Sequence, residues 1–593
     1  MTKEAGNGEA RITRYNNFLL LVAGLGGLLY GVDVGIIGGA LPYLEATSRL
    51  TPGQLSVIVA AVLLGSVFST LFAGALADWL GRKPLMLISG LAFIVSIPVI
   101  ALSHGYAPLF FGRLLQGMSG GLIGVVVPLY LAECMTAARR GRGTGIFQWM
   151  LTLGIVAAAV VGIYYSYRVE VVARYASDAG LFAFKDQAWR RIFWVSLPPG
   201  ILFSLGSLFV QESPRWLYRR GRSEAALAAL LSSRTPAQAA LELQEMAQAA
   251  GDAPGAPGGV ARDSLLQRKY VIPFLLACVI LFCNTATGVN SIIGYNTGIL
   301  LQSGLNDLWA HWGYVLFTVV NFAMTLVGIS LVDRKGRRFL LTLGTSGVIA
   351  SLLFVGAMFH ATESQAINVS AALQAEAAGR DTLRLPFDQA EAARLLAASG
   401  STLNPSHATL GVIYAYGDFI ATTSYARSDD VAAPLVMSRE AAVPANRVEA
   451  FFRNPFADLA KAQHAPLRIL QARLGEVPSA THGWLVALGL YGFMAFFAMG
   501  PGSCVWLALS ELMPTRIRSN GMSIALVINQ MVSTTLAGIF LPFVGRYGYA
   551  AIFFLFAGFT VVYFLTAVFA LPETKGKTLE EIEAHFAGSG SKG

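Results

Sequence analysis

Charged side chains are scarce in this chain, and their scarcity excludes an ordinary soluble protein. Of 593 residues, 13% are charged and 55% are hydrophobic, whereas soluble domains carry about 25% charged residues. A membrane-spanning helix needs roughly 20 consecutive apolar residues. The run at 269–302 is longer than one straight span needs and holds polar groups, so we expect part of it to be irregular. In all, twelve runs are candidate spans, near 15–38, 55–77, 85–103, 108–132, 144–166, 191–210, 269–302, 309–332, 339–358, 484–510, 520–545 and 550–571.

Cysteines are also few, and their positions exclude two further classes of protein. All four lie in or beside apolar runs, so neither a disulfide framework nor a cysteine metal site is expected. A cleavable signal peptide is lacking too, because residues 1–14 are polar and no small-residue cleavage site follows the first apolar run. We therefore expect that run to be the first span. The cysteines are Cys134, Cys278, Cys283 and Cys504.

Basic residues give the chain a net charge of +9, and many of them gather in short loops. No basic segment is interleaved with aromatic side chains that could stack on bases, which argues against nucleic acid as a partner. An excess of Lys and Arg in short loops marks the cytoplasmic side of a bilayer. We therefore expect these loops and both termini in the cytoplasm. The loop residues are Arg82, Lys83, Arg139, Arg140, Arg142, Arg334, Lys335, Arg337, Arg338, Arg516 and Arg518.

Two short motifs occur twice and reveal an internal duplication. A charged loop between two apolar runs is found at 78–83 and again at 333–338, an offset of 255 residues. A glutamate seven residues before an arginine also recurs, with an offset of 378 residues. The difference of 123 residues predicts an insertion in the second half. These glutamates and arginines are Glu133 with Arg140 and Glu511 with Arg518.

We therefore predict an all-α membrane protein of twelve transmembrane helices in two similar halves. The insertion is periplasmic by helix count and near neutral, with helical patches near 387–398 and 457–474 and a β-like run near 410–421. We expect it to be a small extra domain. The boundaries are 1–210 for the N-terminal six-helix bundle, 211–268 for cytoplasmic linker helices, 269–358 for helices 7–9, 359–483 for the insertion, 484–571 for helices 10–12, and 572–593 for a cytoplasmic tail.

Asp33 is an ionisable residue inside the first span. Such a residue is a functional candidate by default and faces a cavity or a partner. Arg113, at the start of the fourth span, is the candidate partner. The pair either carries a coupling proton or is a fixed ion pair that only holds helices together, and the residues alone leave both interpretations open.

The motifs taken together resemble the sugar porter family of the major facilitator superfamily, such as bacterial xylose and hexose–proton symporters. One loop motif alone would be weak, but the ordered set is specific and spans nearly the whole chain apart from the insertion. The resemblance implies two six-helix bundles, a central sugar site and transport by alternating access. The matching segments are 74–83, 133–140, 212–215, 333–338, 500–506, 511–518 and 572–576.

Sugar recognition requires uncharged hydrogen-bonding side chains and an aromatic face, and intramembrane residues of these types are present. Each could instead form a helix-to-helix hydrogen bond. Gln148 and Asn529 have the spacing of the family's sugar-binding positions. Segment 284–290, Asn-Thr-Ala-Thr-Gly-Val-Asn, departs from the family, which usually has two glutamines there. The candidates are Gln148, Asn284, Thr285, Asn290, Tyr295, Asn321, Trp506, Asn529 and Gln530.

We expect a proton-coupled importer of a hexose or pentose, with Asp33 at the family's proton position and no cofactor besides the proton. An inner gate of charged residues would close the cytoplasmic side, and we expect Arg82 near Glu511 and Arg337 near Glu133. The expected partners are a small sugar and the lipid bilayer, and the chain is expected to be a monomer in a bacterial inner membrane. The gate candidates are Asp78, Arg82, Glu133, Arg140, Glu212, Arg215, Asp333, Arg337, Glu511 and Arg518.

Four alternative functions differ from this one in features of the sequence or in a simple measurement. A sugar or polyol uniporter would use Asp33 only structurally, and proton flux on sugar addition distinguishes it from a symporter. A sugar sensor would carry a long cytoplasmic tail, whereas the chain after residue 571 is short. An enzyme carried by the insertion lacks any catalytic constellation. A drug exporter would need a broad apolar lining rather than amides and hydroxyls.

Overall fold

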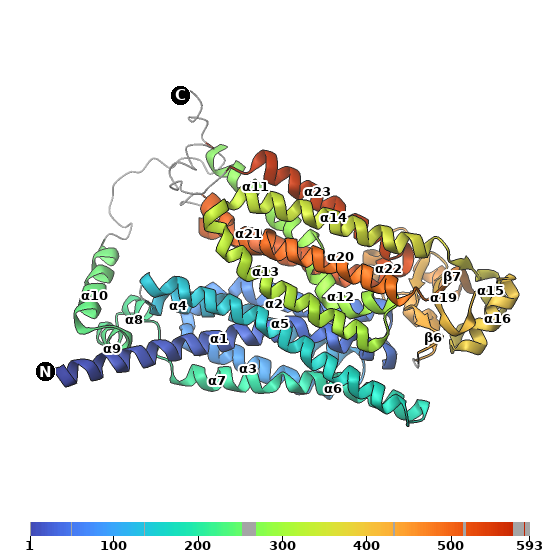
Figure 1. Ribbon diagram of the computed structural model, residues 1–593, viewed down its shortest axis with the longest axis horizontal. Coiled ribbons are helices and arrows are strands. Elements are labelled where there is room, and N and C mark those ends of the chain that lie inside the picture. The colour runs from blue at the N-terminus through green and yellow to red at the C-terminus, as the bar shows by residue number, and fades with distance from the viewer. Residues whose placement is uncertain are drawn as a thin grey trace.

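The structure is a computed structural model in which most of the chain is helical (Figure 1). It describes the chain except residues 1, 49, 136, 252–267, 402, 431–432, 514–517, 573–585 and 587–593. Within the helices, the side chains of Arg140, Asp333, Trp506, Glu511 and Arg518 also lie outside the described part. Twelve helical segments are long and apolar enough to span a membrane, which confirms the predicted number of spans.

The N-terminal half contains the first six spans, and the sixth is built from two helices that meet at Ser196. Two expected boundaries were wrong. The first helix begins at Thr2, so most of the predicted polar tail is helical, and the sixth span begins at Asp178, where the Ser177 side chain caps the helix. The helices are α1 (Thr2–Thr47), α2 (Pro52–Leu80), α3 (Arg82–Ala101), α4 (Tyr106–Cys134), α5 (Ala137–Ala173), α6 (Asp178–Val195) and α7 (Leu197–Phe209).

The seventh span is broken, as its length and polarity predicted. Gly288 has a φ of 84°, and a Cβ there would lie 2.3 Å from the Phe556 ring, so only glycine fits. The helices of this half are α11 (Arg268–Ala286), α12 (Val289–Gln302), α13 (Asp307–Lys335), α14 (Arg337–Glu363), α20 (Ala480–Met499), α21 (Pro501–Leu512), α22 (Arg518–Tyr547) and α23 (Tyr549–Leu565), followed by a π-helical turn at Thr566–Ala570.

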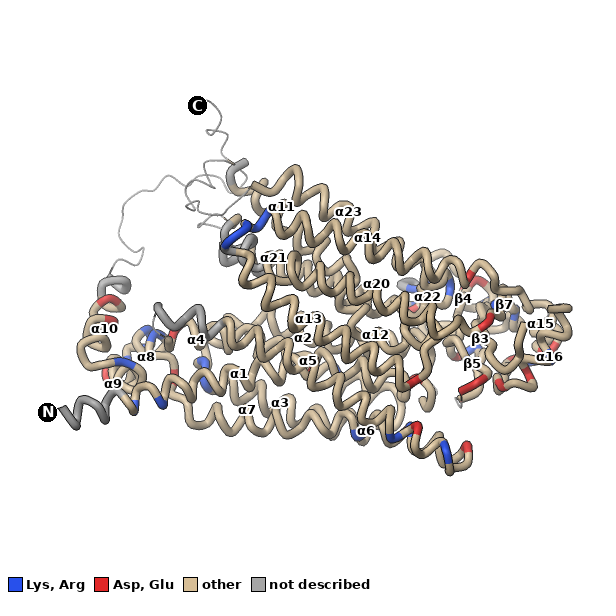
Figure 2. Tube along the Cα trace, in the orientation of Figure 1, with Lys and Arg blue, Asp and Glu red and all other residues tan. Residues whose placement is uncertain are grey.

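Three short helices between the halves lie at the same end of the molecule as the start of α1 (Figure 1). They contact the first span through a hydrogen bond: the Asn16 side-chain amide of α1 donates to the Ser233 carbonyl of α9 over 3.2 Å. Charged residues are sparse along the spans and more frequent toward the two ends of the molecule (Figure 2), as expected for helices that cross a bilayer. The three helices are α8 (Pro214–Arg219), α9 (Ser223–Ser233) and α10 (Pro236–Gly251).

The insertion is a separate α+β module at the opposite end of the molecule from α8 and α9 (Figure 1). It has its own apolar core, which includes Leu383, Leu395, Leu410 and Leu474. One sheet has the strand order β1-β7-β3-β4 with β5 beside β3, and β2 pairs with β6 in a second sheet. The strands are β1 (Ile367–Asn368), β2 (Thr382–Leu385), β3 (Ala408–Tyr416), β4 (Phe419–Thr422), β5 (Ala426–Arg427), β6 (Leu435–Ser438) and β7 (Leu467–Glu476).

The helical patch predicted near 387–398 and the β-like run near 410–421 are confirmed by α16 and by the antiparallel β3 and β4. The helix predicted near 457–474 is wrong beyond His464, because β7 occupies Leu467–Glu476. Its side chains alternate between buried and exposed from Leu467 to Leu470, the period of a strand. The module's helices are α15 (Ser370–Ala377), α16 (Gln389–Ser399), α17 (Arg439–Ala442), α18 (Arg447–Arg453) and α19 (Leu459–His464), with a 3-10 turn at Pro405–His407.

The insertion belongs to the C-terminal half by sequence, yet it contacts both halves. Arg427 donates to the carbonyls of Leu301 and Leu305 at the end of α12, over 2.9 and 3.2 Å. On the N-terminal half, Lys185 Nζ of α6 lies 2.6 Å from Asp430 Oδ1. The Ala433 amide also donates to the Ala46 carbonyl of α1 over 2.9 Å. The module therefore bridges the ends of the two halves at what we call the outer face.

Candidate functional site

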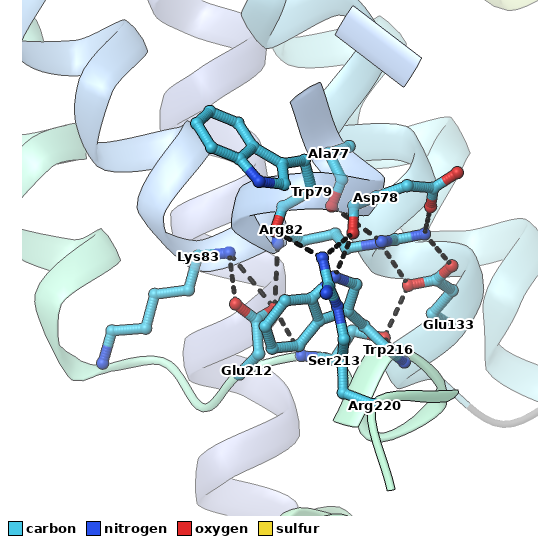
Figure 3. A network of polar contacts seen from close by, with 10 residues as sticks. All are labelled: Ala77, Asp78, Trp79, Arg82, Lys83, Glu133, Glu212, Ser213, Trp216 and Arg220. Carbon is cyan, nitrogen blue, oxygen red and sulfur yellow. Dashed lines mark hydrogen bonds and ion pairs between the residues drawn. The ribbon is translucent and has the colours of Figure 1, made fainter. Parts of the chain in front are cut away.

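A buried arginine organises the end of the N-terminal half that faces α8 (Figure 3). Arg82 follows Gly81 between α2 and α3, and its side chain is 2% exposed. Its guanidinium lies 3.0 Å from Asp78 Oδ1 and 2.8 Å from Glu133 Oε2. It also donates to the Ala77 carbonyl over 2.9 Å. Two carboxylates and a carbonyl thus compensate the buried charge, as a desolvated arginine requires.

Glu212 caps the start of α3 from the linker between the halves (Figure 3). Its carboxylate accepts from the backbone amides of Arg82 over 3.0 Å and of Ser213 over 2.7 Å, as well as from that of Lys83. Burial raises the pKa of Glu212, and these amide donors act in the opposite direction. A Cβ on Gly81 would lie 2.3 Å from the Glu212 carboxylate, which explains a glycine here. The predicted members Asp78, Arg82, Glu133 and Glu212 therefore form one network.

Arg215 does not join this network, contrary to the sequence-based expectation. Its side chain is exposed, and within the described part of the chain it forms no hydrogen bond or ion pair. Trp216 and Arg220 of the same segment replace it (Figure 3). The Trp216 indole donates to the Asp78 carbonyl over 2.8 Å, and the Arg220 guanidinium donates to the same carbonyl over 3.0 Å. Sequence reasoning missed both residues, because they lie outside the segment 212–215 that carries the family resemblance.

The C-terminal half repeats one element of this arrangement. Arg337 donates to the Val332 carbonyl five residues earlier over 3.5 Å, as Arg82 donates to that of Ala77. The preceding glycines also match, with φ of 102° at Gly81 and 89° at Gly336. The two arginines therefore occupy equivalent places, as predicted. The other residues predicted for the inner gate, namely Arg140, Asp333, Glu511 and Arg518, have side chains outside the described part.

The expectation that Arg337 lies near Glu133 was wrong, and the expected contact of Arg82 with Glu511 lies outside the described residues. Glu133 is bound by Arg82 of its own half, which occupies both of its oxygens together with the Ser213 hydroxyl. The reason is the packing within the bundle, because the end of α4 lies directly beside the turn between α2 and α3 (Figure 3).

Asp33 and Arg113 are both buried in the N-terminal half, each 1% exposed, on α1 and α4. They form no ion pair within 4.0 Å, although Arg113 is near enough to act on Asp33 electrostatically. The Arg113 guanidinium instead donates to the Gln116 side chain over 2.6 Å and lies over the Phe193 ring. Within the described part of the chain, neither Asp33 oxygen has a hydrogen-bond partner. An ionised carboxylate is costly in such a place, and a proton on it would remove that cost.

Several predicted sugar-binding side chains form hydrogen bonds between helices within the C-terminal half. Asn290 donates to Ser533 over 2.6 Å, and Tyr295 donates to the Ala537 carbonyl over 2.9 Å. Asn529 donates to the Leu281 carbonyl over 2.9 Å, and Thr285 donates to the Asn529 carbonyl. These bonds fasten α11 and α12 to α22. Their role in sugar binding stays a prediction.

The remaining candidates for sugar binding have polar groups that are more exposed or less fully hydrogen-bonded. Gln148 is exposed on α5, next to Trp149, whose ring lies 5.7 Å from that of Phe322 on α13 of the other half. Asn321 and Gln530 are partly exposed. Asn284 is 6% exposed, and its carbonyl oxygen has no partner. The Trp506 side chain lies outside the described part.

Asn296 on α12 is a polar residue that sequence reasoning missed. Its side chain is fully buried, and neither its oxygen nor its nitrogen has a hydrogen-bond partner. A buried amide without partners is uncommon in proteins. Its neighbour Thr297 donates to the Gly38 carbonyl of α1, so Asn296 lies on the helix that contacts the other half. The only indication in the sequence that Asn296 could be functional was its position within an apolar run.

The outer side of the pathway is closed by a cluster that sequence reasoning also missed. Asp307 Oδ2, at the start of α13, accepts from the Tyr43 hydroxyl of α1 over 2.7 Å and from the Ser166 hydroxyl of α5 over 2.5 Å. His311 lies 3.3 Å from the Gly39 carbonyl and stacks on Tyr43, with ring centroids 5.5 Å apart. Nearby, the Tyr314 hydroxyl donates to a carbonyl of α1. One aspartate thus joins both halves, and the structure is closed toward the outer face.

We expect Asp307→Ala to open this outer gate. The substitution leaves two buried hydroxyls without their acceptor, at a cost of about 1–3 kcal/mol for the closed state. Nitroxide labels at Tyr175→Cys and Phe456→Cys, both exposed, one on each side of the gate, should report longer distances by pulsed electron paramagnetic resonance. Asp178→Ala, which removes an exposed carboxylate of α6, should leave the distances unchanged. An unchanged distribution in Asp307→Ala would show that the cluster does not hold the gate.

Two repeated halves of six spans, closed at one face and carrying matching arginines at the other, define a membrane transporter of the major facilitator class. It is not an enzyme. A family model described as "Sugar (and other) transporter" matches residues 19–375 and 469–586. The chain belongs to this family, the sugar porters of the major facilitator superfamily.

Individual relatives cover nearly the whole chain at low identity. The glucose transporter GlcP of Staphylococcus epidermidis is 25% identical, with 96% of this chain and 97% of that protein aligned. The galactose-proton symporter of Escherichia coli is 24% identical over 96% and 94% of the two chains. A crystal structure of a D-xylose-proton symporter has a TM-score of 0.60 at 19% identity, covering 95% of this chain and 100% of that one. This structural likeness supports the fold.

Proposed function

We propose that this protein is a proton-coupled importer of a monosaccharide, either a hexose or a pentose, that works by alternating access. The observation that carries the proposal is Asp33, a buried carboxyl without a hydrogen-bond partner in the first span of a sugar-transporter-family chain. Relatives named for glucose transport, galactose–proton symport and xylose–proton symport support the substrate class and the coupling ion. The proton is the coupling ion, and no cofactor is needed.

In the proposed cycle, Asp33 gains a proton from the outer side while the outer gate is open. Protonation weakens its attraction to Arg113, which then binds Gln116 as in the outer-closed structure. Sugar binds between the halves, and the Asp307 cluster closes behind it. A shift of this kind requires only that proton and sugar favour one conformation over the other. Loss of the proton to the cytoplasm then resets the carrier.

The topology and assembly follow the same proposal. We place both termini and the α8–α10 helices in the cytoplasm, because the short basic loops lie at that end. The insertion then faces the periplasm of a bacterial inner membrane. We propose a monomer, since each half of the chain supplies one wall of the pathway.

The experiment that tests the function is uptake of radiolabelled D-xylose, D-glucose, D-galactose and myo-inositol into proteoliposomes with an imposed pH gradient. We expect one or more of these sugars to accumulate and to carry protons inward. Gln148→Ala should remove most binding and uptake, because it deletes an exposed amide beside the contact between the halves. Loss of one hydrogen bond to a neutral ligand costs about 0.5–1.5 kcal/mol.

The matched control is Gln365→Ala, which removes an exposed glutamine just after α14. It should leave uptake at the level of the unaltered protein. Equal uptake by both variants would remove Gln148 from the sugar site. Absence of uptake for every sugar tested, with a well-folded protein, would refute the proposed substrate class.

A further inference from the structure

A chamber lies on the outer side of the closed gate, beneath the insertion. Its volume is about 500 Å³, which is within the range of small-molecule sites. Tyr43 and Asp307, the residues that close the gate, form part of its lining. The rest comes from the outer ends of both halves and from the insertion segment 423–435. A molecule in the chamber would therefore lie directly over the gate.

Ion pairs and hydrogen bonds join the parts of the chain that line this chamber. Lys185 of the N-terminal half is 2.6 Å from Asp430 of the insertion, and both side chains line the chamber. Arg427, also in the lining, donates to the Leu301 carbonyl of the C-terminal half. The insertion thus encloses the space through fixed polar contacts with each half, which keeps the lining groups in place before a ligand arrives.

The lining disfavours anions and is rich in acceptors for hydroxyls, because it contains five carboxylates, Glu45, Glu170, Asp307, Asp429 and Asp430, beside two cations. Its two cations are already paired, Lys185 with Asp430 and Arg427 with Asp429 over 2.8 Å. Although burial acts to raise the pKa of Asp429, the hydrogen bonds and charge of Arg427 hold it below its ordinary value. The lining therefore leaves no cation free to attract an anion. The paired carboxylates retain lone pairs that accept hydrogen bonds from hydroxyls.

Aromatic side chains complete the lining. Tyr425 of the insertion and Tyr549 of α23 both face the chamber, with ring centroids 6.4 Å apart. Burial raises the pKa of Tyr425 to about 12, so its hydroxyl remains a donor. Rings beside paired carboxylates provide an apolar surface for sugar C–H groups and acceptors for sugar hydroxyls. Gln302 and Asn306 add side-chain amides to the same lining.

We propose that this chamber is a second, outer binding site for a monosaccharide, which holds sugar above the closed gate before it reaches the pathway between the halves. The inference rests on the proposed function for its substrate class. The chamber extends beyond the predicted central site: Tyr295 is a candidate for that site and also lines the chamber, whereas Tyr425, Arg427 and Asp430 lie in residues 376–468, which the family match omits. The outer site thus combines the outer ends of the transporter core with residues that only the insertion supplies.

The test is equilibrium binding of radiolabelled D-glucose, D-galactose, D-xylose and myo-inositol to the purified full-length protein. We expect a biphasic isotherm for the transported sugar. Tyr425→Ala should remove one phase, and Gln148→Ala should remove the other. Phe456→Ala, which removes a fully exposed ring of the insertion, should retain both phases. A single phase that Gln148→Ala abolishes and Tyr425→Ala leaves intact would overturn the outer site but preserve the proposed function.

A second variant keeps the test decisive if Tyr425→Ala folds poorly. Gly298 lines the chamber, and a Cβ there would meet nothing within 4 Å, so Gly298→Cys should fold normally. A bulky methanethiosulfonate on this cysteine should remove the outer phase, and dithiothreitol should restore it. An isotherm unchanged by the reagent would refute the outer site. Absence of binding for all four sugars in the unaltered protein would refute the proposed function itself.

Discussion

Asp33→Asn is expected to abolish accumulation of sugar driven by a pH gradient while leaving counterflow exchange largely intact. The asparagine is nearly the same size as the protonated acid but cannot release a proton. Since Asp33 is 1% exposed and neither of its oxygens has a hydrogen-bond partner, a neutral side chain should fit there without loss of stability. The internal sugar concentration should then rise no higher than the external one.

The measurement is uptake in proteoliposomes with and without a pH gradient, paired with exchange of labelled for unlabelled sugar. Asp178→Asn makes the same change at an exposed position of α6 and should accumulate sugar normally. If Asp33→Asn still concentrates sugar against its gradient, the coupling proton binds elsewhere. If the unaltered protein moves no protons with sugar, the protein is a uniporter, and Asp33 is structural.

Arg82→Glu is expected to reduce uptake by at least about tenfold, since breaking a buried ion pair typically costs about 3–5 kcal/mol. The substitution places a third acid beside Asp78 and Glu133, which now lie 3.0 and 2.8 Å from the guanidinium. Repulsion should force these groups apart and detach α8 from the end of α4, because Glu133 also accepts the Ser213 hydroxyl at the start of α8. Initial rates of sugar uptake, normalised to protein in the membrane, measure the effect.

Arg215→Glu is the matched control, because it reverses the same charge in the same region at an exposed side chain outside the network. It should transport normally. Thermal unfolding of both purified variants separates a gating defect from loss of the fold. Normal uptake by Arg82→Glu would show that the inner network is not needed for the transport cycle.

The membrane architecture could be predicted from sequence because its physical causes are local. A span of roughly 20 apolar residues must satisfy its backbone within one helix, so the twelve helices followed from composition alone. The break near Gly288 followed from the excess length of the seventh run. The duplicated loops correctly placed Arg82 and Arg337 in equivalent positions, because repeated sequence folds alike.

The residues that contact a given side chain were harder to predict than the place of that side chain in the fold. Glu133 and Glu511 occupy equivalent positions in the two repeats, so the sequence alone could not show which of them pairs with Arg82. Arg82 pairs with Glu133 because the end of α4 lies beside the turn before α3. The outer gate was missed for a related reason. Asp307, Tyr43 and Ser166 lie more than a hundred residues apart and belong to no motif. Similarly, β7 follows a helical segment, and its alternation extends over only a few residues.

The insertion leaves and rejoins the membrane part at neighbouring points, where His482 of α20 contacts the Met358 carbonyl of α14 over 3.1 Å. Both of its ends therefore join the C-terminal half, while its residue Asp430 contacts Lys185 of the N-terminal half. Opening of the outer face would separate Asp430 of the module from Lys185 of α6, because this ion pair joins the module to the other half. A fluorophore pair spanning Asp430 and α6 would turn this movement into an optical readout of turnover in living cells. An antibody fragment bound between the insertion and α6 would hold the outer face in a single conformation.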